Sequence, residues 1–162
     1  MNISRAFRNI FLPVLCGCSQ LAWAYELATF STDVTIPLGH ACMGGGILPA
    51  WQIADPLEAR GVALIGAEKP FVFVSVDWCE IRNDAYDRFR EVLAEAASTT
   101  RDHVLISCVH VHDAPVVDFT AQKLLDEHDL HRSLCDSKFS EDCFQRTASA
   151  LSEAVKLPQP IT

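Results

Sequence analysis

The amino-acid sequence predicts an α/β fold, in which a mixed sheet contains a βαβ unit and is flanked by helices. Residues 71–77 and 104–109 are short, strongly apolar runs that are typical of buried strands. Between them, apolar side chains recur at helical spacing over residues 84–98. A strand, a helix and a second strand in this order predict parallel strands with a right-handed connection.

The segment before this unit predicts further strands and a long loop. Residues 27–36 contain Thr and Val in a pattern typical of a strand. Residues 37–56 are rich in glycine and proline and predict an irregular loop. Three consecutive glycines at 44–46 allow close backbone approach to a ligand, so this loop either lies on the surface or folds over a site. Residues 61–66 and 70–76 are two apolar runs joined by a short turn, which predicts a β-hairpin.

Three helices are expected after the hairpin. Asn83 is a suitable N-cap for the helix over 84–98, because its side chain can accept a hydrogen bond from a free backbone N–H. Two further helical patterns cover roughly residues 117–128 and 140–156.

Composition limits the function classes. The chain has 162 residues, 49% of them hydrophobic and 21% charged, which suits one domain with a real core. The formal charge of -8 and the lack of a Lys/Arg run argue against nucleic-acid binding.

Residues 1–24 predict a signal peptide. Arg5 and Arg8 precede a short apolar segment, and residues 22–24 read Ala-Trp-Ala, a small-x-small cleavage pattern. The alternative is a degenerate lipoprotein signal in which Cys18 is lipidated. Either way, residues 25–162 are expected to form an acidic, exported protein in the periplasm or outside the cell.

Five cysteines follow the predicted signal peptide. They are Cys42, Cys79, Cys108, Cys135 and Cys143. The odd number leaves at least one thiol free or paired outside the chain, while Cys135 and Cys143 are close enough in sequence to form a disulfide. No CxxC pair exists among them, which argues against a zinc ribbon or a thioredoxin-like site.

The candidate site lies where the two strands of the βαβ unit end. Asp77 ends the first strand, and His110 and His112 end the second. Ligands of open α/β sheets bind outside the carboxyl ends of the strands, and residues i and i+2 of a strand share a face. One acid and two imidazoles are therefore expected at one edge of the sheet, an arrangement that suits a divalent metal such as Zn²⁺. Asp77 is expected to have a catalytic role there, as a metal ligand, a base or a residue that orients a ligand or the substrate.

Other interpretations of these residues stay open. An HxH pair is common on exposed strands and loops without any metal. Cys79 and Cys108 lie near the same strand ends, so a thiol nucleophile paired with a histidine is an alternative, although buried structural thiols are commoner. His40 lies in the glycine-rich loop and is a weaker candidate. The remaining histidines, His103, His128 and His131, are expected to be solvated.

Several motifs together resemble the neutral/alkaline non-lysosomal ceramidase family, and in particular its bacterial, ceramidase-like secreted branch. The motifs are VTIPLGH (34–40), DPLEARGVALIG (55–66), VDWCEIRNDAYDRFREVLAEAA (76–97), VLISCVHVHDAP (104–115) and SLCD (133–136). The resemblance implies a zinc-dependent amidase that cleaves the N-acyl bond of sphingolipids. It also implies that residues 25–162 are the N-terminal portion of a larger layered α/β catalytic domain. It implies that His110 is a zinc ligand and that His112 contacts the substrate or the reacting centre.

The chain also departs from the family pattern. Where the family reads GTHTHSGP, Val111 replaces the middle Thr, and Asp113 with Ala114 replaces Ser-Gly. The resemblance further implies a second histidine, a glutamate and a tyrosine as metal ligands from positions beyond residue 162. Together, the candidate site and the resemblance predict a secreted metal-dependent amide hydrolase, in a truncated or incomplete chain. Its expected substrate is a small-molecule or lipid amide, and a lipid substrate would bring the protein into peripheral contact with a membrane. The alternative is a non-catalytic exported module that binds a ligand or a metal with an incomplete active site.

Overall fold

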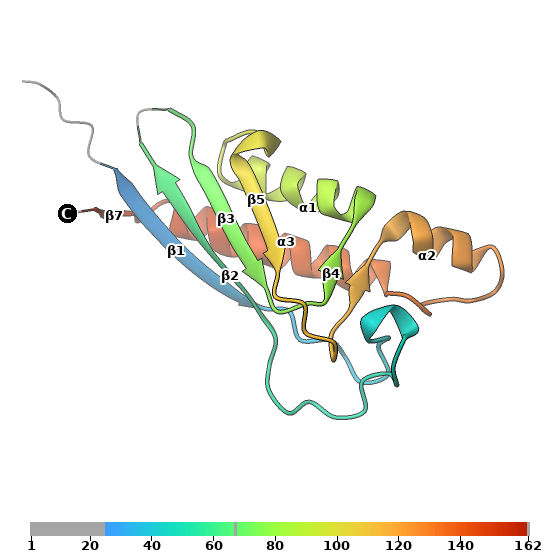
Figure 1. Ribbon diagram of the computed structural model, residues 1–162. Helices are drawn as coiled ribbons and strands as arrows, with labels where there is room; N and C mark the ends of the chain where they lie inside the picture. The colour runs from blue at the N-terminus through green and yellow to red at the C-terminus, as the bar shows by residue number, and fades with distance from the viewer. Residues whose placement is uncertain (1–24, 67, 162) are drawn as a thin grey trace, which may run out of the picture.

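The main sheet has five strands in the order β5-β3-β2-β1-β7 (Figure 1). A computed structural model describes residues 25–66 and 68–161. The strands of this sheet are β1 (Glu26–Asp33), β2 (Glu58–Ile65), β3 (Phe71–Val76), β5 (Val104–Cys108) and β7 (Gln159–Pro160). A second, two-stranded parallel sheet joins β4 (Glu80–Ile81) to β6 (Val116–Val117).

The helices pack mainly on one face of the main sheet. They are α1 (Asn83–Ala96), α2 (Phe119–Asp126) and α3 (Ser137–Ala154). Figure 1 shows α1 and α3 behind the sheet, with α2 beyond its lower right end. Two short 3-10 helices, Met43–Gly45 and Arg101–His103, lie in connecting segments. The predicted α/β class, with a mixed sheet and flanking helices, is confirmed.

The predicted hairpin and βαβ unit are both present. β2 and β3 pair antiparallel, from Ala59 with Val76 to Leu64 with Phe71. β3 and β5 pair in parallel with α1 between them in the chain. The carboxyl ends of these two strands therefore lie at the same edge of the sheet.

The core lies between the sheet and the helices α1 and α3. Alternate residues of β3 (Val72, Val74 and Val76) are buried on this side, as the period-two pattern of a half-covered strand requires. The rings of Phe89 and Phe144, from α1 and α3, stack at 4.2 Å. Residues on the other face remain exposed, so the helices cover one side of the sheet.

Several element boundaries differ from the predictions. The first strand ends at Asp33, because Val34 already donates its backbone N–H to the Leu57 carbonyl outside the ladder. Residues 116–117 form β6 and not a helix, so α2 begins only at Phe119. The predicted N-cap Asn83 is wrong: Arg82 occupies that position without a side-chain cap.

Asn83 has a different role. Its side-chain amide donates a hydrogen bond to the Asp118 carboxylate at 2.5 Å, and Asp118 in turn caps α2 by accepting from the Ala121 N–H at 2.9 Å. Asn83 therefore ties the start of α1 to the start of α2.

The predicted signal peptide and the alternative lipid site at Cys18 lie outside the described residues. Within the described ranges, no helix is long and apolar enough to cross a bilayer. The five described cysteines are all free, so a Cys135–Cys143 disulfide does not form in this fold. Both of these thiols are instead buried separately in the core.

Candidate functional site

The candidate site lies at the sheet edge where β3 and β5 end. The last pair of the parallel ladder is Val76 with Cys108. Two further hydrogen bonds hold the chains together beyond it, from the Val109 N–H to the Val76 carbonyl and from the His110 N–H to the Trp78 carbonyl, both at 3.1 Å. The segments after the two strands therefore meet, as the βαβ unit predicts.

The two histidines lie together, but not for the reason that the sequence suggests. β5 ends at Cys108, and His110 has a φ of 65°, in the left-handed region that non-glycine residues rarely occupy. The alternation of a strand therefore does not extend to His112. The rings of His110 and His112 nevertheless lie 5.1 Å apart, nearly perpendicular at 83°. A turn, and not a regular strand, brings them to one place.

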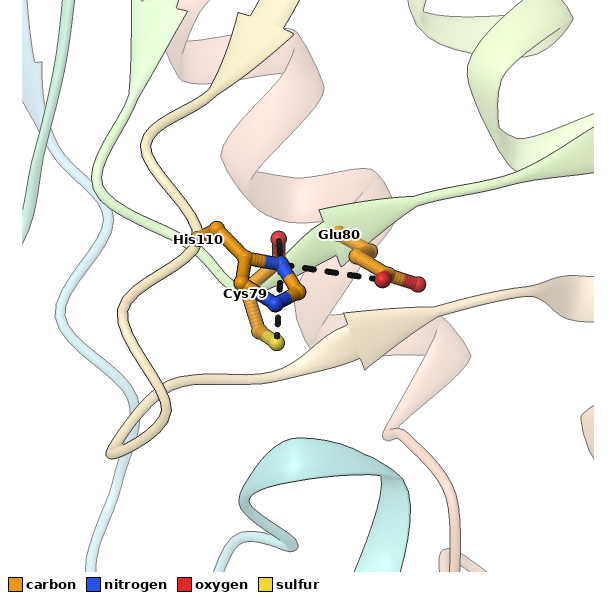
Figure 2. A group of neighbouring side chains, drawn as sticks. All are labelled: Cys79, Glu80 and His110. Atoms are coloured by element: carbon orange, nitrogen blue, oxygen red, sulfur yellow. Dashed lines mark hydrogen bonds and ion pairs between the residues drawn. The ribbon is translucent and has the colours of Figure 1, made fainter.

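His110 contacts two residues that the sequence did not single out as metal ligands (Figure 2). Its Nδ1 atom lies 3.7 Å from the Cys79 Sγ and 3.6 Å from a carboxylate oxygen of Glu80. It also lies 3.2 Å from the Cys79 carbonyl oxygen. One donor atom from each of the three side chains falls within 4.8 Å of the others.

The surroundings of this cluster are partly buried and carry both charges. Cys79 is 2% exposed, and burial, followed by the negative charge of Glu80, raises the pKa of its thiol. One Glu80 oxygen, Oε2, is buried against the Arg82 guanidinium in an ion pair, although it accepts no hydrogen bond of regular geometry. The His110 side chain is 58% exposed. A pocket of about 310 Å³ adjoins the three side chains and is also lined by Cys108.

The same environment argues against a thiol nucleophile. Burial raises the pKa of the Cys108 thiol to about 12, and the pKa of the Cys79 thiol is also raised. Both thiols are therefore protonated at neutral pH in the metal-free protein, and a protonated thiol is a weak nucleophile.

Asp77 lies at the predicted edge, but its carboxylate is engaged elsewhere. Its Oδ2 accepts a hydrogen bond from the Glu58 N–H at 3.0 Å, and its own N–H donates to the Glu58 carbonyl at 2.9 Å. Asp77 therefore fastens the start of β2 to the end of β3. It is not one of the three residues that share the Cys79–Glu80–His110 cluster.

The other histidines have structural or surface positions. His40 is buried: its Nε2 accepts from the Asp136 N–H at 3.3 Å, which leaves Nδ1 to donate to the Ala41 carbonyl at 2.8 Å. Desolvation lowers its pKa, so the ring is neutral. His103 was expected to be solvated, which is wrong: it is half-buried and stacks on Phe71 at 4.2 Å. His128 and His131 are exposed, as expected.

The glycine-rich loop folds toward the histidine segment. The Met43 N–H donates to the Ala114 carbonyl at 2.9 Å, and residues 47–55 line a pocket of about 700 Å³ together with Val111 and Asp113. Gly44 has a φ of 63°, which favours glycine, and a Cβ there would lie 3.0 Å from the Leu134 side chain. The loop therefore packs against the segment that follows the two histidines, while the pocket beside Cys79, Glu80 and His110 is lined by none of its residues.

The donor set of the cluster fits a transition-metal ion. A thiol, an imidazole and a carboxylate are the three side-chain types that bind zinc in proteins, and three protein ligands leave one position open for water or substrate. The sequence contained one usable signal for Cys79 and Glu80 as metal ligands, namely that both lie within four residues of the end of β3. An isolated Cys-Glu pair has no metal-ligand spacing of its own, so the sequence pattern does not identify these two residues as ligands.

Two solved structures are similar to this chain. One is the neutral ceramidase from Pseudomonas aeruginosa, with a TM-score of 0.59 and 17% sequence identity. The other is a ceramidase complexed with C2, with a TM-score of 0.54 and 15% identity. Each alignment covers 85% of this chain and 22% of the ceramidase chain. No family model and no curated protein matches the sequence.

These comparisons define the fold class. The chain has an α/β fold shared with bacterial neutral ceramidase, and it spans 22% of the length of the ceramidase structures that it matches. The likeness predicted from the sequence motifs is confirmed as a likeness of fold.

Proposed function

We propose that this chain carries part of the catalytic centre of an exported, metal-dependent amide hydrolase that acts on N-acyl sphingosine or a related N-acyl amide. The observation that carries the proposal is the pair of adjacent imidazoles, His110 and His112, at the carboxyl edge of a ceramidase-like sheet. Ligand sites of open α/β sheets lie at this edge. The predicted signal peptide supports export, and a lipid amide would bring the protein into contact with membranes.

His110 would hold the metal through its imidazole, as the motif resemblance implies. The chemistry of the nearby donors supports this role, because Cys79 and Glu80 offer a thiol and a carboxylate beside Nδ1. A bound Zn²⁺ would act as a Lewis acid and lower the pKa of a bound water to about 7.

His112 would transfer protons. In amide hydrolysis, water adds to the acyl carbon, the C–N bond breaks, and the amine nitrogen gains a proton. An imidazole can take a proton from the attacking water and give it to the leaving nitrogen, or can stabilise the developing oxyanion. The exposed position of His112 beside His110 leaves it accessible to a substrate.

Asp77 would act as a positioning residue. Its carboxylate holds the Glu58 backbone and so fixes the chain segment that leads directly into Cys79 and Glu80. It orients the ligands through the backbone and would not touch the reacting atoms.

The test is turnover of N-acyl sphingosine and of simpler N-acyl amines, with and without a chelator. The proposal predicts zinc-restored activity that falls by about 100-fold or more in His110→Ala and His112→Ala. His128→Ala, a change at an exposed histidine on another segment, is the matched control and should retain full activity. Activity that survives both metal removal and His110→Ala would contradict the proposal.

A second candidate function is a non-catalytic exported binding module. It is favoured by the departures at Val111, Asp113 and Ala114 from the family motif, which alter the segment around His112. A purified protein that binds metal stoichiometrically, yet hydrolyses none of these amides, would support this candidate over the first.

A further inference from the structure

We propose that Cys79, Glu80 and His110 form a three-donor site for a thiophilic divalent ion, of the zinc or cobalt class, whose ligands all come from residues 79–110 of this chain. This set differs from the one implied by the motif resemblance, which takes its further ligands from beyond residue 162. The inference deepens the proposed function, with which it shares the metal role of His110 and the nearby donors Cys79 and Glu80, but it does not depend on amide hydrolysis.

Two of the three separations between donor atoms match those of a tetrahedral site. With a Zn–S distance of about 2.3 Å and Zn–N and Zn–O distances of about 2.1 Å, tetrahedral angles put nitrogen about 3.6 Å from sulfur and about 3.4 Å from oxygen. In the protein, the His110 Nδ1 lies 3.7 Å from the Cys79 Sγ and 3.6 Å from the Glu80 oxygen. These two separations are within a few tenths of an ångström of the tetrahedral values, and the third, between the Cys79 Sγ and a Glu80 oxygen, is within 4.8 Å.

The backbone holds the three residues in place. The N–H groups of Cys79 and Glu80 both donate to the Pro115 carbonyl, at 3.1 and 3.2 Å, and Glu80 pairs with Val116 in the small sheet. On the other side, the His110 N–H is bonded to the Trp78 carbonyl, and His110 keeps its unfavourable φ of 65°. Backbone strain of this kind persists where surrounding contacts enforce it and is concentrated at functional sites.

The donor types determine which ions bind. Thiolate and imidazole prefer zinc and its transition-metal neighbours, whereas Mg²⁺ and Ca²⁺ prefer sites made of oxygen atoms alone. One ligand position remains open, and the adjoining pocket of about 310 Å³ gives access to it.

Cys108 provides a matched control. It lines the same pocket, and burial keeps its thiol protonated, but it is not one of the three clustered donors. A conservative change at Cys108 therefore perturbs the pocket and the thiol content without removing a proposed ligand.

The test is titration of the metal-free 162-residue chain with Co²⁺, followed by absorption spectroscopy. We expect one Co²⁺ per chain, a sulfur-to-cobalt charge-transfer band, displacement by Zn²⁺ and no displacement by Mg²⁺. Cys79→Ser should abolish the band. Glu80→Gln and His110→Ala should each weaken binding about tenfold or more, while Cys108→Ser should behave as wild type.

Three outcomes would overturn the inference: no band in the wild-type protein, a band that persists in Cys79→Ser, or a band lost in Cys108→Ser. Circular dichroism and thermal unfolding of each variant distinguish the loss of a ligand from misfolding. If Cys79→Ser does not fold, Glu80→Gln tests the loss of a different proposed ligand. The assay measures no turnover. Cobalt binding without amide hydrolysis would therefore contradict the proposed function and leave the metal site standing.

Discussion

Replacing Gly61 by alanine should destabilise the protein, although alanine is normally the better residue in an extended strand. Gly61 in β2 pairs with Phe30 in β1, and a Cβ on Gly61 would lie 2.3 to 2.9 Å from three atoms of the Phe30 ring. Carbon atoms normally approach to about 3.5 Å or more, so the ring must move by about 1 Å. Phe30 is 8% exposed and belongs to the core, which leaves little space for that movement.

The magnitude follows from two opposing effects. Overpacking of a core costs about 1–3 kcal/mol, while removing a strand glycine returns about 0.5–1 kcal/mol. The expected loss for Gly61→Ala therefore lies between about 0 and 2.5 kcal/mol and centres near 1 kcal/mol, or roughly 3–5 °C in Tm for a domain of this size. Urea unfolding followed by circular dichroism measures the free energy of unfolding directly.

The matched experiment repeats the substitution in a Phe30→Leu background. Leucine lacks the ring atoms nearest to Gly61, so Gly61→Ala should there be neutral or stabilising, which gives a coupling energy of about 1 kcal/mol or more. The reasoning would be refuted by an equal cost in both backgrounds, or by stabilisation of the wild-type background.

Three further predictions concern the residues around the sheet edge and the loop. Burial lowers the pKa of His40, so in acid the unfolded chain binds a proton there that the folded chain does not, and the free energy of unfolding should fall as the pH drops below the ordinary histidine pKa of 6.5. In His40→Gln, the dependence of Tm on pH should flatten in this range. An unchanged slope would show that His40 is not the group responsible. Asp77→Ala should lower the free energy of unfolding by about 1–3 kcal/mol, because the Glu58 N–H loses its acceptor. Asp77→Asn keeps an oxygen acceptor and should lower it less. Equal losses in the two variants would show that this hydrogen bond is not the cause. Trp78→Phe removes an indole N–H that donates to the Val34 carbonyl at 3.0 Å, and should lower the free energy of unfolding by about 1–3 kcal/mol in urea; a loss below about 0.5 kcal/mol would contradict this.

The main features of the fold could be predicted because they depend on local pattern and general topology. Two apolar runs around a helical segment were enough to predict that β3 and β5 are parallel neighbours. Because parallel neighbours end at the same edge of a sheet, the segments after both strands were correctly predicted to meet there. The pairing of β4 with β6 was missed because two-residue strands carry no periodicity.

The details of the candidate site depend on tertiary contacts that sequence pattern does not encode. His110 leaves strand geometry because its N–H bonds to the Trp78 carbonyl, and this turns its ring toward Cys79 and Glu80. Asp77 was expected to face the histidines, but its side chain satisfies a backbone N–H of β2. Hydrogen bonds across the sheet edge therefore place Glu80, and not Asp77, beside the His110 imidazole.

X-ray absorption at the zinc edge on the zinc-loaded, full-length chain tests the metal centre most directly. The account predicts one sulfur neighbour at about 2.3 Å and nitrogen or oxygen neighbours at about 2.0–2.2 Å, with the sulfur contribution lost in Cys79→Ser and retained in Cys108→Ser. A spectrum with only nitrogen and oxygen neighbours in the wild-type protein, or a chain that does not retain zinc, would contradict it.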